Sequence, residues 1–249
     1  MSAPALIALA HGSRDPRSAR TVREIVAATK QMRPDLRIDV AFLDHARPDL
    51  ETVVDRLVAK GHTEIVVVPL LLTSAYHARV DVPAVVQRAA ERHQGVGLRA
   101  AEVIGTDAAL LTILDERLRE ALKSARVREL DALVLAAAGS SDARANASVA
   151  RLARLWGTRH HLPTSVAFAS TAPPSTGEAV RDWRRQGRRH VAVGSLFIAP
   201  GKLPDRAEEL ALEAGAVAVS QPLGGHYELG RLILARYSVG ALQLVQLPA

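Results

Sequence analysis

The sequence predicts an α/β protein built from two tandem homologous domains, each a mainly four-stranded parallel sheet flanked by helices. Short β-branched or aliphatic runs alternate with longer amphipathic stretches, which is typical of βα units around a parallel sheet. This order occurs twice in the 249 residues, and residues at matching positions of the two halves correspond. Hydrophobic residues make up 48% of the chain, enough to bury two cores of ordinary size.

Four βα units make up the first half. Gly61 follows one expected helix as a C-terminal glycine, and Pro34 follows another, because proline cannot continue a helix. The third strand is apolar on both faces, as a central parallel strand covered by helices must be. The expected strands are 5–10, 37–43, 64–72 and 97–103, and the expected helices are 17–32, 49–60, 82–93 and 107–124.

The second half repeats this order with recognisable residues. His11 aligns with Ala138 at the end of a strand, and Phe42 aligns with Phe168. We therefore expect domains at 1–125 and 126–249, joined by a polar linker at 124–130. The apolar run 239–247 has no counterpart in the first half, and either a packing strand or a frayed tail would account for it. The expected strands are 132–137, 164–168, 190–198 and 216–219, and the expected helices are 143–156, 177–186, 205–213 and 227–237.

Composition limits the chemistry that the chain can perform. With no cysteine, disulfides and thiolate metal sites are excluded, so a metal must bind to His, Asp or Glu. A formal charge of +6, mostly from arginine, favours an anionic partner. We do not expect that partner to be a nucleic acid, because only 3% of the residues are aromatic and no zinc-finger pattern occurs. No signal peptide or membrane helix is expected, which favours the cytoplasm.

Three polar residues follow the first three expected strands: His11, Asp44 and His77. Ligands of parallel sheets bind at the carboxyl ends of the strands, so these side chains are expected to converge. Two imidazoles and a carboxylate suit Fe²⁺, Co²⁺, Ni²⁺ or Zn²⁺. A single strand-end histidine is more often an ordinary loop residue. However, the second half has Ala138 and Ser170 at the matching positions and no histidine at 199–202, and this asymmetry favours a metal site in the first half alone.

The turn Gly12-Ser13-Arg14-Asp15 opens the first helix, whose N-terminal N–H groups favour an anion. Arg14, Arg17 and Arg20 recur every three residues. They form either a solvated helix face or a carboxylate-binding edge beside the metal site.

Several other functions fit the sequence less well. Fe(II) oxygenases use two histidines and a carboxylate but usually sit on antiparallel barrels. Histidine phosphatases have an arginine before the His-Gly pair, where Ala10 stands here. No Gly-x-Ser-x-Gly motif supports an esterase, and no glycine-rich nucleotide motif implies an organic cofactor. A metal or tetrapyrrole carrier that uses the same histidines without turnover remains an alternative.

Taken together, several segments resemble the class II tetrapyrrole chelatases, the CbiX/SirB-type sirohydrochlorin chelatases. They are residues 11–17, 41–44 and 68–72, followed by His77 and the run Asp81-Val82-Pro83. The resemblance spans nearly the whole chain, because long members contain two such domains with a cleft between them. It implies a lyase that inserts a divalent metal into sirohydrochlorin, Fe²⁺ being favoured over Co²⁺ as the substrate, in siroheme or cobalamin biosynthesis.

The resemblance also implies roles for individual residues. His11 and His77 match the two active-site histidines of the family, and would hold the metal and accept pyrrole protons. Asp44 stands where the family usually has glutamate, and would stabilise the imidazolium or complete the coordination. The metal is then a substrate, no organic cofactor is needed, and a monomer with its site between the domains is expected. Ser13, Arg14, Arg17 and Arg79 would bind the carboxylates of the anionic tetrapyrrole.

Overall fold

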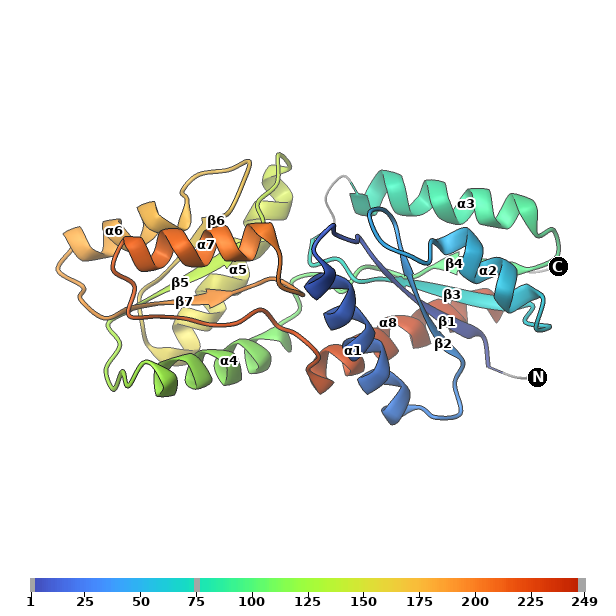
Figure 1. Cartoon of the computed structure of the whole chain (residues 1–249), viewed down its shortest axis with the longest axis horizontal. Coiled ribbons are helices and arrows are strands. Elements are labelled where there is room, and N and C mark those ends of the chain that lie inside the picture. The colour runs from blue at the N-terminus through green and yellow to red at the C-terminus, as the bar shows by residue number, and fades with distance from the viewer. Residues whose placement is uncertain (1–2, 74–76, 246–249) are drawn as a thin grey trace. The chain divides into compact units, whose positions relative to one another are not determined.

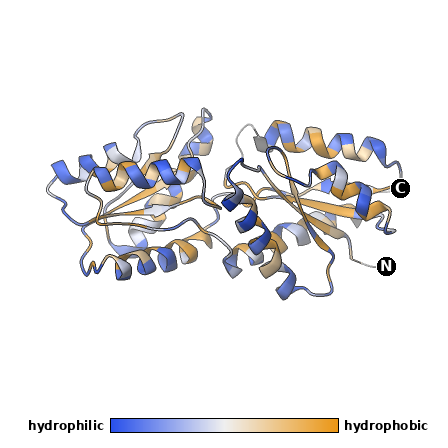
Figure 2. Cartoon of the chain, viewed as in Figure 1, coloured by the Kyte–Doolittle hydropathy of each residue, from blue (hydrophilic) through white to orange (hydrophobic). Residues whose placement is uncertain are grey.

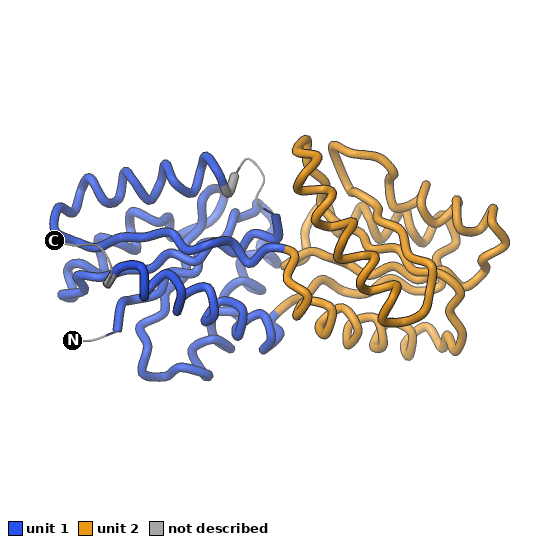
Figure 3. The backbone as a smooth tube through the Cα atoms, turned by 180° about the vertical axis from the view of Figure 1, so that it is seen from behind, with its two compact units in different colours: residues 1–105, 225–249 blue, residues 106–224 orange. Residues whose placement is uncertain are grey.

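The computed structural model describes residues 3–73 and 77–245 of the chain. It contains two four-stranded sheets with all neighbouring strands parallel, each covered by helices on both faces (Figure 1). The chain divides into two compact units (Figure 3). The first comprises residues 1–105 together with 225–249, and the second comprises residues 106–224. The predicted α/β class with two four-stranded parallel sheets is confirmed.

In the first unit the strand order is β2-β1-β3-β4. The central strand β1 pairs with β2 through Ala10 and Phe42 and with β3 through Leu9 and Pro69, so the three carboxyl ends lie together at one edge. The strands are β1 (Ala5–Ala10), β2 (Ile38–Phe42), β3 (Glu64–Pro69) and β4 (Gly97–Ala100).

Helices cover both faces of this sheet (Figure 1). Helices α2 (Leu50–Val58) and α3 (Val82–Arg92) share a core with the β3 side chains of Ile65 and Val67. Helices α1 (Pro16–Met32) and α8 (Tyr227–Val245) lie on the other face, where Gly240 approaches Val66. Strand β3 is therefore buried on both sides, as its continuous apolar sequence predicts.

The second unit repeats the arrangement, with the strand order β6-β5-β7-β8. Helices α6 and α7 share a core with Val134 and Val193, while the Trp156 ring of α5 packs against Gly194 on the other face. The strands are β5 (Ala132–Ala137), β6 (Thr164–Phe168), β7 (Val191–Ser195) and β8 (Ala218–Val219), and the helices are α4 (Leu110–Ser124), α5 (Ala143–His160), α6 (Thr176–Arg185) and α7 (Lys202–Glu213).

The strands in Figure 2 are mainly hydrophobic, and the outer faces of the helices are mainly hydrophilic. Leu6, Val66 and Leu133 are fully buried, as expected for strands covered on both faces. None of the helices in the described ranges is both long enough and apolar enough to span a bilayer.

The compact units differ from the domains expected at 1–125 and 126–249. Helix α4 packs against β7 and β8 of the second unit, and α8 packs against α1, β3 and β4 of the first. The stretch 124–130, expected to link the domains, instead leads from α4 into β5 within the second unit. The chain crosses between the units at 105–106 and at 224–225.

The run 239–247 is neither a strand nor a frayed tail as far as the structure describes it. Helix α8 continues to Val245, and residues 246–247 lie outside the described residues. Leu244 is buried, and Arg99 donates a hydrogen bond to the side chain of Gln243 over 2.8 Å. Gly240 and Leu244 of this additional length lie against the first sheet, whereas Val239 and Leu242 are exposed.

Candidate functional site

The turn after β1 brings His11 beside the loop that follows β2. The backbone N–H of Asp44 donates to the His11 carbonyl over 2.9 Å, and Leu43 N–H donates to Ala10 in the same way. Gly12 has φ +91°, and a Cβ at this position would lie 1.8 Å from the Asp44 carbonyl oxygen. Only glycine permits both the left-handed conformation and this close approach.

His11 and Asp44 line the same cavity, which has a volume of about 300 Å³. The convergence of these two strand ends, predicted from the sequence, is therefore present. The remaining described lining comes from the loop after β2, from the residue before α3 and from α3 itself. These residues are Leu43, Asp81, Ala84, Val85 and Arg88.

The imidazole of His11 lies close to its own turn. Its Nδ1 is 3.2 Å from the carbonyl oxygen of Gly12. A carbonyl can only accept a hydrogen bond, so this contact favours the tautomer with the proton on Nδ1. Nε2 then carries the lone pair that a metal ion or a proton needs.

The carboxylate of Asp44 turns toward its neighbour His45. One oxygen accepts the His45 backbone N–H over 2.7 Å, and the other lies 3.3 Å from His45 Nε2. His45 has a left-handed backbone, with φ 58°, and its ring lies beside the Asp44 carboxylate. The Asp44 side chain is 65% exposed, and is thus accessible to solvent at the mouth of the cavity.

His77 begins a π-helical turn, η1 (His77–Asp81), which leads into α3. Its side chain lies outside the part of the chain whose side chains are described, so the pairing of two imidazoles stays a prediction. The other end of the same turn, Asp81, lines the cavity of His11. Among the side chains that the structure does describe, no three His, Asp or Glu groups are arranged to hold a metal ion.

The predicted substrate-binding residues do not line this cavity. The Ser13 hydroxyl accepts the backbone N–H of Asp15, which caps α1. Arg17 donates to both carboxylate oxygens of Asp15 from Nε over 3.1 Å and from Nη2 over 2.6 Å. These bonds lower the pKa of Asp15 below its ordinary value. Arg14 and Arg79 are exposed.

Five described cavity residues were not among the predicted site residues: Leu43 and four residues of the segment that begins at Asp81. Asp81, Ala84, Val85 and Arg88 recur at the spacing i, i+3, i+4, i+7, and so share one stripe of the helix. The buried residues of α3, Val82, Val86 and Ala89, form the neighbouring stripe. The spacing is visible in the sequence, but it does not reveal that the stripe of Arg88 borders His11.

The second unit contains the same turn, with Ala138 and Ser170 in place of His11 and Asp44. Gly139 has φ +87°, and the Ser170 N–H donates to the Ala138 carbonyl over 3.0 Å. Asp142 caps α5 and accepts the N–H of Arg144, as Asp15 does for Arg17 in α1. The second repeat therefore retains the backbone frame and differs in the groups that could bind a metal.

Comparison with known proteins assigns both repeats to the same family. The chain matches the family model CbiX twice, over residues 5–121 and again over residues 132–239.

Two curated relatives come from Priestia megaterium. The sirohydrochlorin cobaltochelatase is 29% identical over 203 residues, covering 80% of this chain and 66% of the relative. The sirohydrochlorin ferrochelatase is 27% identical over 237 residues, covering 92% of this chain and 87% of the relative. The chain thus spans slightly less than two thirds of the first relative and most of the second.

Among solved structures, SirB from Bacillus subtilis with Fe³⁺ has a TM-score of 0.81 at 24% identity. The match covers 98% of each chain. At this level of identity the likeness establishes the fold, including the presence of two tandem α/β repeats.

Proposed function

This chain belongs to the CbiX family, and we propose that it is a chelatase that inserts Fe²⁺ or Co²⁺ into sirohydrochlorin. One observation carries the proposal: His11 and Asp44, from two adjacent strand ends, line one cavity in the first repeat. The second repeat has the same backbone frame, with Ala138 and Ser170 in their places. A purely structural histidine at position 11 would not explain this difference.

Both metals remain in the proposal because the curated relatives include a cobaltochelatase and a ferrochelatase. Imidazole and carboxylate ligands accept either ion. The biosynthetic product would be siroheme with iron, which we favour, and a cobalamin precursor with cobalt. The metal is a substrate here, and no organic cofactor enters the proposal.

In the proposed mechanism, His11 binds the incoming ion through Nε2 while Nδ1 stays bonded to the Gly12 carbonyl. His77 supplies the second imidazole from the start of η1. Metallation releases two pyrrole protons, and histidine is suited to accept them because its pKa lies near neutral pH. Asp44 stabilises the resulting positive charge or completes the coordination.

The finer parts of the proposal concern assembly and substrate contacts. We propose a cytoplasmic monomer. The proposed contacts for substrate carboxylates are Ser13, Arg14, Arg17 and Arg79. To bind the substrate, Arg17 must break its ion pair with Asp15.

The test follows sirohydrochlorin absorbance anaerobically after addition of Fe²⁺ or Co²⁺. We expect the wild-type protein to metallate sirohydrochlorin. The metallation rates of His11→Ala and His77→Ala should be at least about 100-fold lower, as is typical when a general base is removed. His62→Ala is the matched control, because His62 precedes β3 whereas His77 follows it. Ser170→Ala is the control for Asp44→Ala.

Equal rates in wild type and both active-site histidine variants would overturn the mechanism. Tight binding of metal or tetrapyrrole by wild type without metallation would instead identify a carrier.

A further inference from the structure

Arg88 is the only lysine or arginine among the described residues that line the cavity of His11. Asp44 and Asp81 line the same cavity. The two aspartates suit a metal cation but would repel a substrate carboxylate. An anionic macrocycle whose centre approaches His11 therefore needs a cation at this cavity, and Arg88 provides one.

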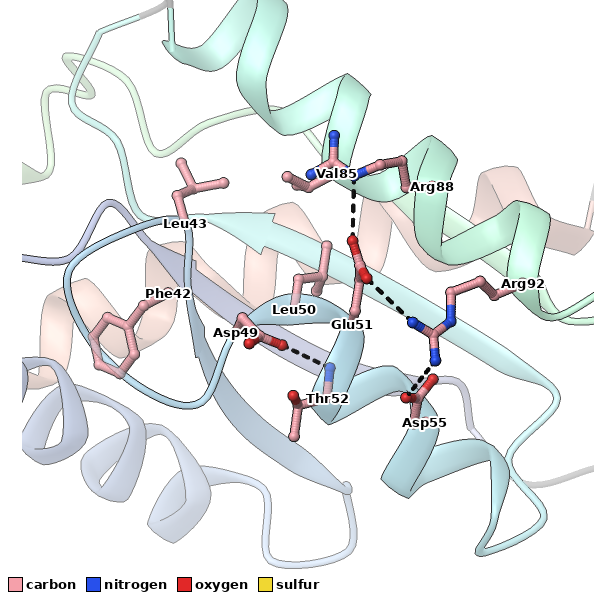
Figure 4. A pocket seen from close by; sticks show the side chains of 10 residues that line it. All are labelled: Phe42, Leu43, Asp49, Leu50, Glu51, Thr52, Asp55, Val85, Arg88 and Arg92. Carbon is pink, nitrogen blue, oxygen red and sulfur yellow. Dashed lines mark hydrogen bonds and ion pairs between the residues drawn. The ribbon is translucent and has the colours of Figure 1, made fainter.

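Arg88 also lies at the junction of two cavities. The second cavity, of about 320 Å³, is enclosed by α2, α3 and the β2 loop (Figure 4). The two cavities share Leu43, Val85 and Arg88. Neither cavity alone would enclose a tetrapyrrole, so a macrocycle at His11 would extend beyond the cavity of His11. Arg88 lies where the edge of such a macrocycle could reach the second cavity.

The ion pairs of α3 distinguish Arg88 from its neighbour Arg92. Arg88 contacts Glu51 through Nε over 3.2 Å, whereas Arg92 contacts both Glu51 over 3.3 Å and Asp55 over 3.0 Å (Figure 4). In the described structure, the single ion pair of Arg88 leaves its two terminal nitrogens able to bind a carboxylate with two parallel hydrogen bonds. Arg92 lines only the second cavity.

The second repeat again provides an internal comparison. Aligning Pro83 of α3 with Pro204 of α7 also aligns the last residues of the two helices, Arg92 and Glu213. Glu209 then stands where Arg88 stands. The repeat without His11 and Asp44 thus has the opposite charge at this position.

We infer that Arg88 binds a carboxylate of the anionic tetrapyrrole, with Glu51 positioning its guanidinium group. The inference rests on the proposed function, because it names a contact of the same substrate. The cavity then has an acidic side, which receives the metal ion, and a basic side, which holds the macrocycle. Glu51 fixes Nε, and the remaining donors face the substrate carboxylate in a charge-assisted pair.

The test measures equilibrium binding of metal-free sirohydrochlorin to the full chain by difference absorbance, so that it requires no turnover. We expect Arg88→Gln to raise Kd roughly 10- to 100-fold, the loss typical of a hydrogen bond to a charged group. Arg88→Lys keeps the charge and should lose less, because it lacks the bidentate geometry. Arg92→Gln, one turn along α3, should change Kd by less than about 5-fold.

Steady-state assays give a second readout. The KM for sirohydrochlorin should rise in Arg88→Gln while the KM for the metal stays unchanged. If Arg88→Gln does not fold, Arg88→Lys must still weaken binding more than Arg92→Gln does.

If Arg88→Gln and Arg88→Lys both bind sirohydrochlorin with wild-type affinity, the inference is overturned. The proposed function would still stand in that case if the wild-type protein metallates sirohydrochlorin. Binding that depends on Arg88 in a protein that never metallates would support the inference and contradict the chelatase. If wild type does not bind sirohydrochlorin, both fail.

Discussion

Gly12 and Gly139 occupy equivalent positions in the two repeats, and both approach a carbonyl oxygen too closely for a side chain. A Cβ would lie 1.8 Å from the Asp44 oxygen in the first repeat and 2.1 Å from the Ser170 oxygen in the second. Both residues also have positive φ. The same close approach of backbone therefore borders the proposed site in the first repeat and the Ala138 turn in the second.

We predict that Gly12→Ala and Gly139→Ala each destabilise the fold by at least about 2 kcal/mol, because alanine must either adopt a positive φ or displace the neighbouring loop. Only Gly12→Ala should also lose metallation activity, since it displaces Asp44 from His11. Denaturant unfolding and metallation rates at a temperature where both variants are folded check this. Equal losses of activity in the two variants would contradict it.

At the residue scale, the sequence predicts the end of β1 at Ala10 and the end of β2 within one residue, because polar residues follow both strands. Strands β3, β4 and β7 each end three residues before the expected position, because an apolar run can continue into the loop after a strand. His11 and Asp44 are accordingly found at one cavity. The direction of the Asp44 carboxylate could not be predicted, since it depends on the left-handed backbone of His45. The place of Arg88 could not be predicted either, because the helical spacing identifies its stripe but not what that stripe borders.

At the scale of secondary-structure elements, the buried carboxylate of Asp115 in α4 holds this helix against α5. The Asp115 carboxylate accepts a hydrogen bond from Trp156 Nε1 over 2.7 Å and lies 2.7 Å from His160 Nε2. Arg159 Nε lies 3.2 Å from its other oxygen. The Asp115 side chain is only 8% exposed. These contacts account for the place of α4 in the second unit.

We predict that Asp115→Ala destabilises the second unit by about 2–4 kcal/mol, because the buried indole N–H loses its acceptor and two basic groups lose their partner. Arg119→Ala, on the exposed face of α4, should stay within about 0.5 kcal/mol of wild type. Chemical denaturation followed by Trp fluorescence measures both. A loss below about 1 kcal/mol in Asp115→Ala would show that α4 is held mainly by other contacts.

The sequence predicts helices at the positions of α4 and α8 but not the sheet that each one covers. Both helices have an apolar stripe and occupy equivalent places in their repeats. Sequence order therefore assigns α4 to the first half, whereas the structure places it in the second unit. That assignment depends on side-chain contacts between distant segments, which a pattern along the chain does not reveal.

At the scale of the whole molecule, α8 returns the end of the chain to the first unit. Tyr237 donates to the Pro4 carbonyl over 2.7 Å, and Arg236 donates to the carbonyls of Val103 and Ile104 over 3.0 Å each. Each unit thus contains a helix from the part of the chain that sequence order assigns to the other. The stability of the unit that carries His11 therefore depends on residues near the C-terminus.

We predict that Gly240→Leu lowers hydrogen-exchange protection in β1 and β3 while β5 and β7 keep theirs. A Cβ at Gly240 would lie 2.7 Å from Val66 Cγ1, so the larger side chain must separate α8 from the first sheet. Gly194→Ala is the converse control, because its Cβ would lie 2.5 Å from the Trp156 ring in the second unit. Loss of protection in β5 and β7 of Gly240→Leu would contradict the assignment of α8.

The central claim is that metal binds in the first repeat and not in the second. The most direct test is the anomalous scattering of a crystal soaked in Co²⁺, measured at the cobalt absorption edge. We predict an anomalous peak about 2.1 Å from Nε2 of His11, the usual length of a metal–imidazole bond, and no peak beside Ala138. No peak at His11, or an equal peak at the Ala138 turn, would contradict the account.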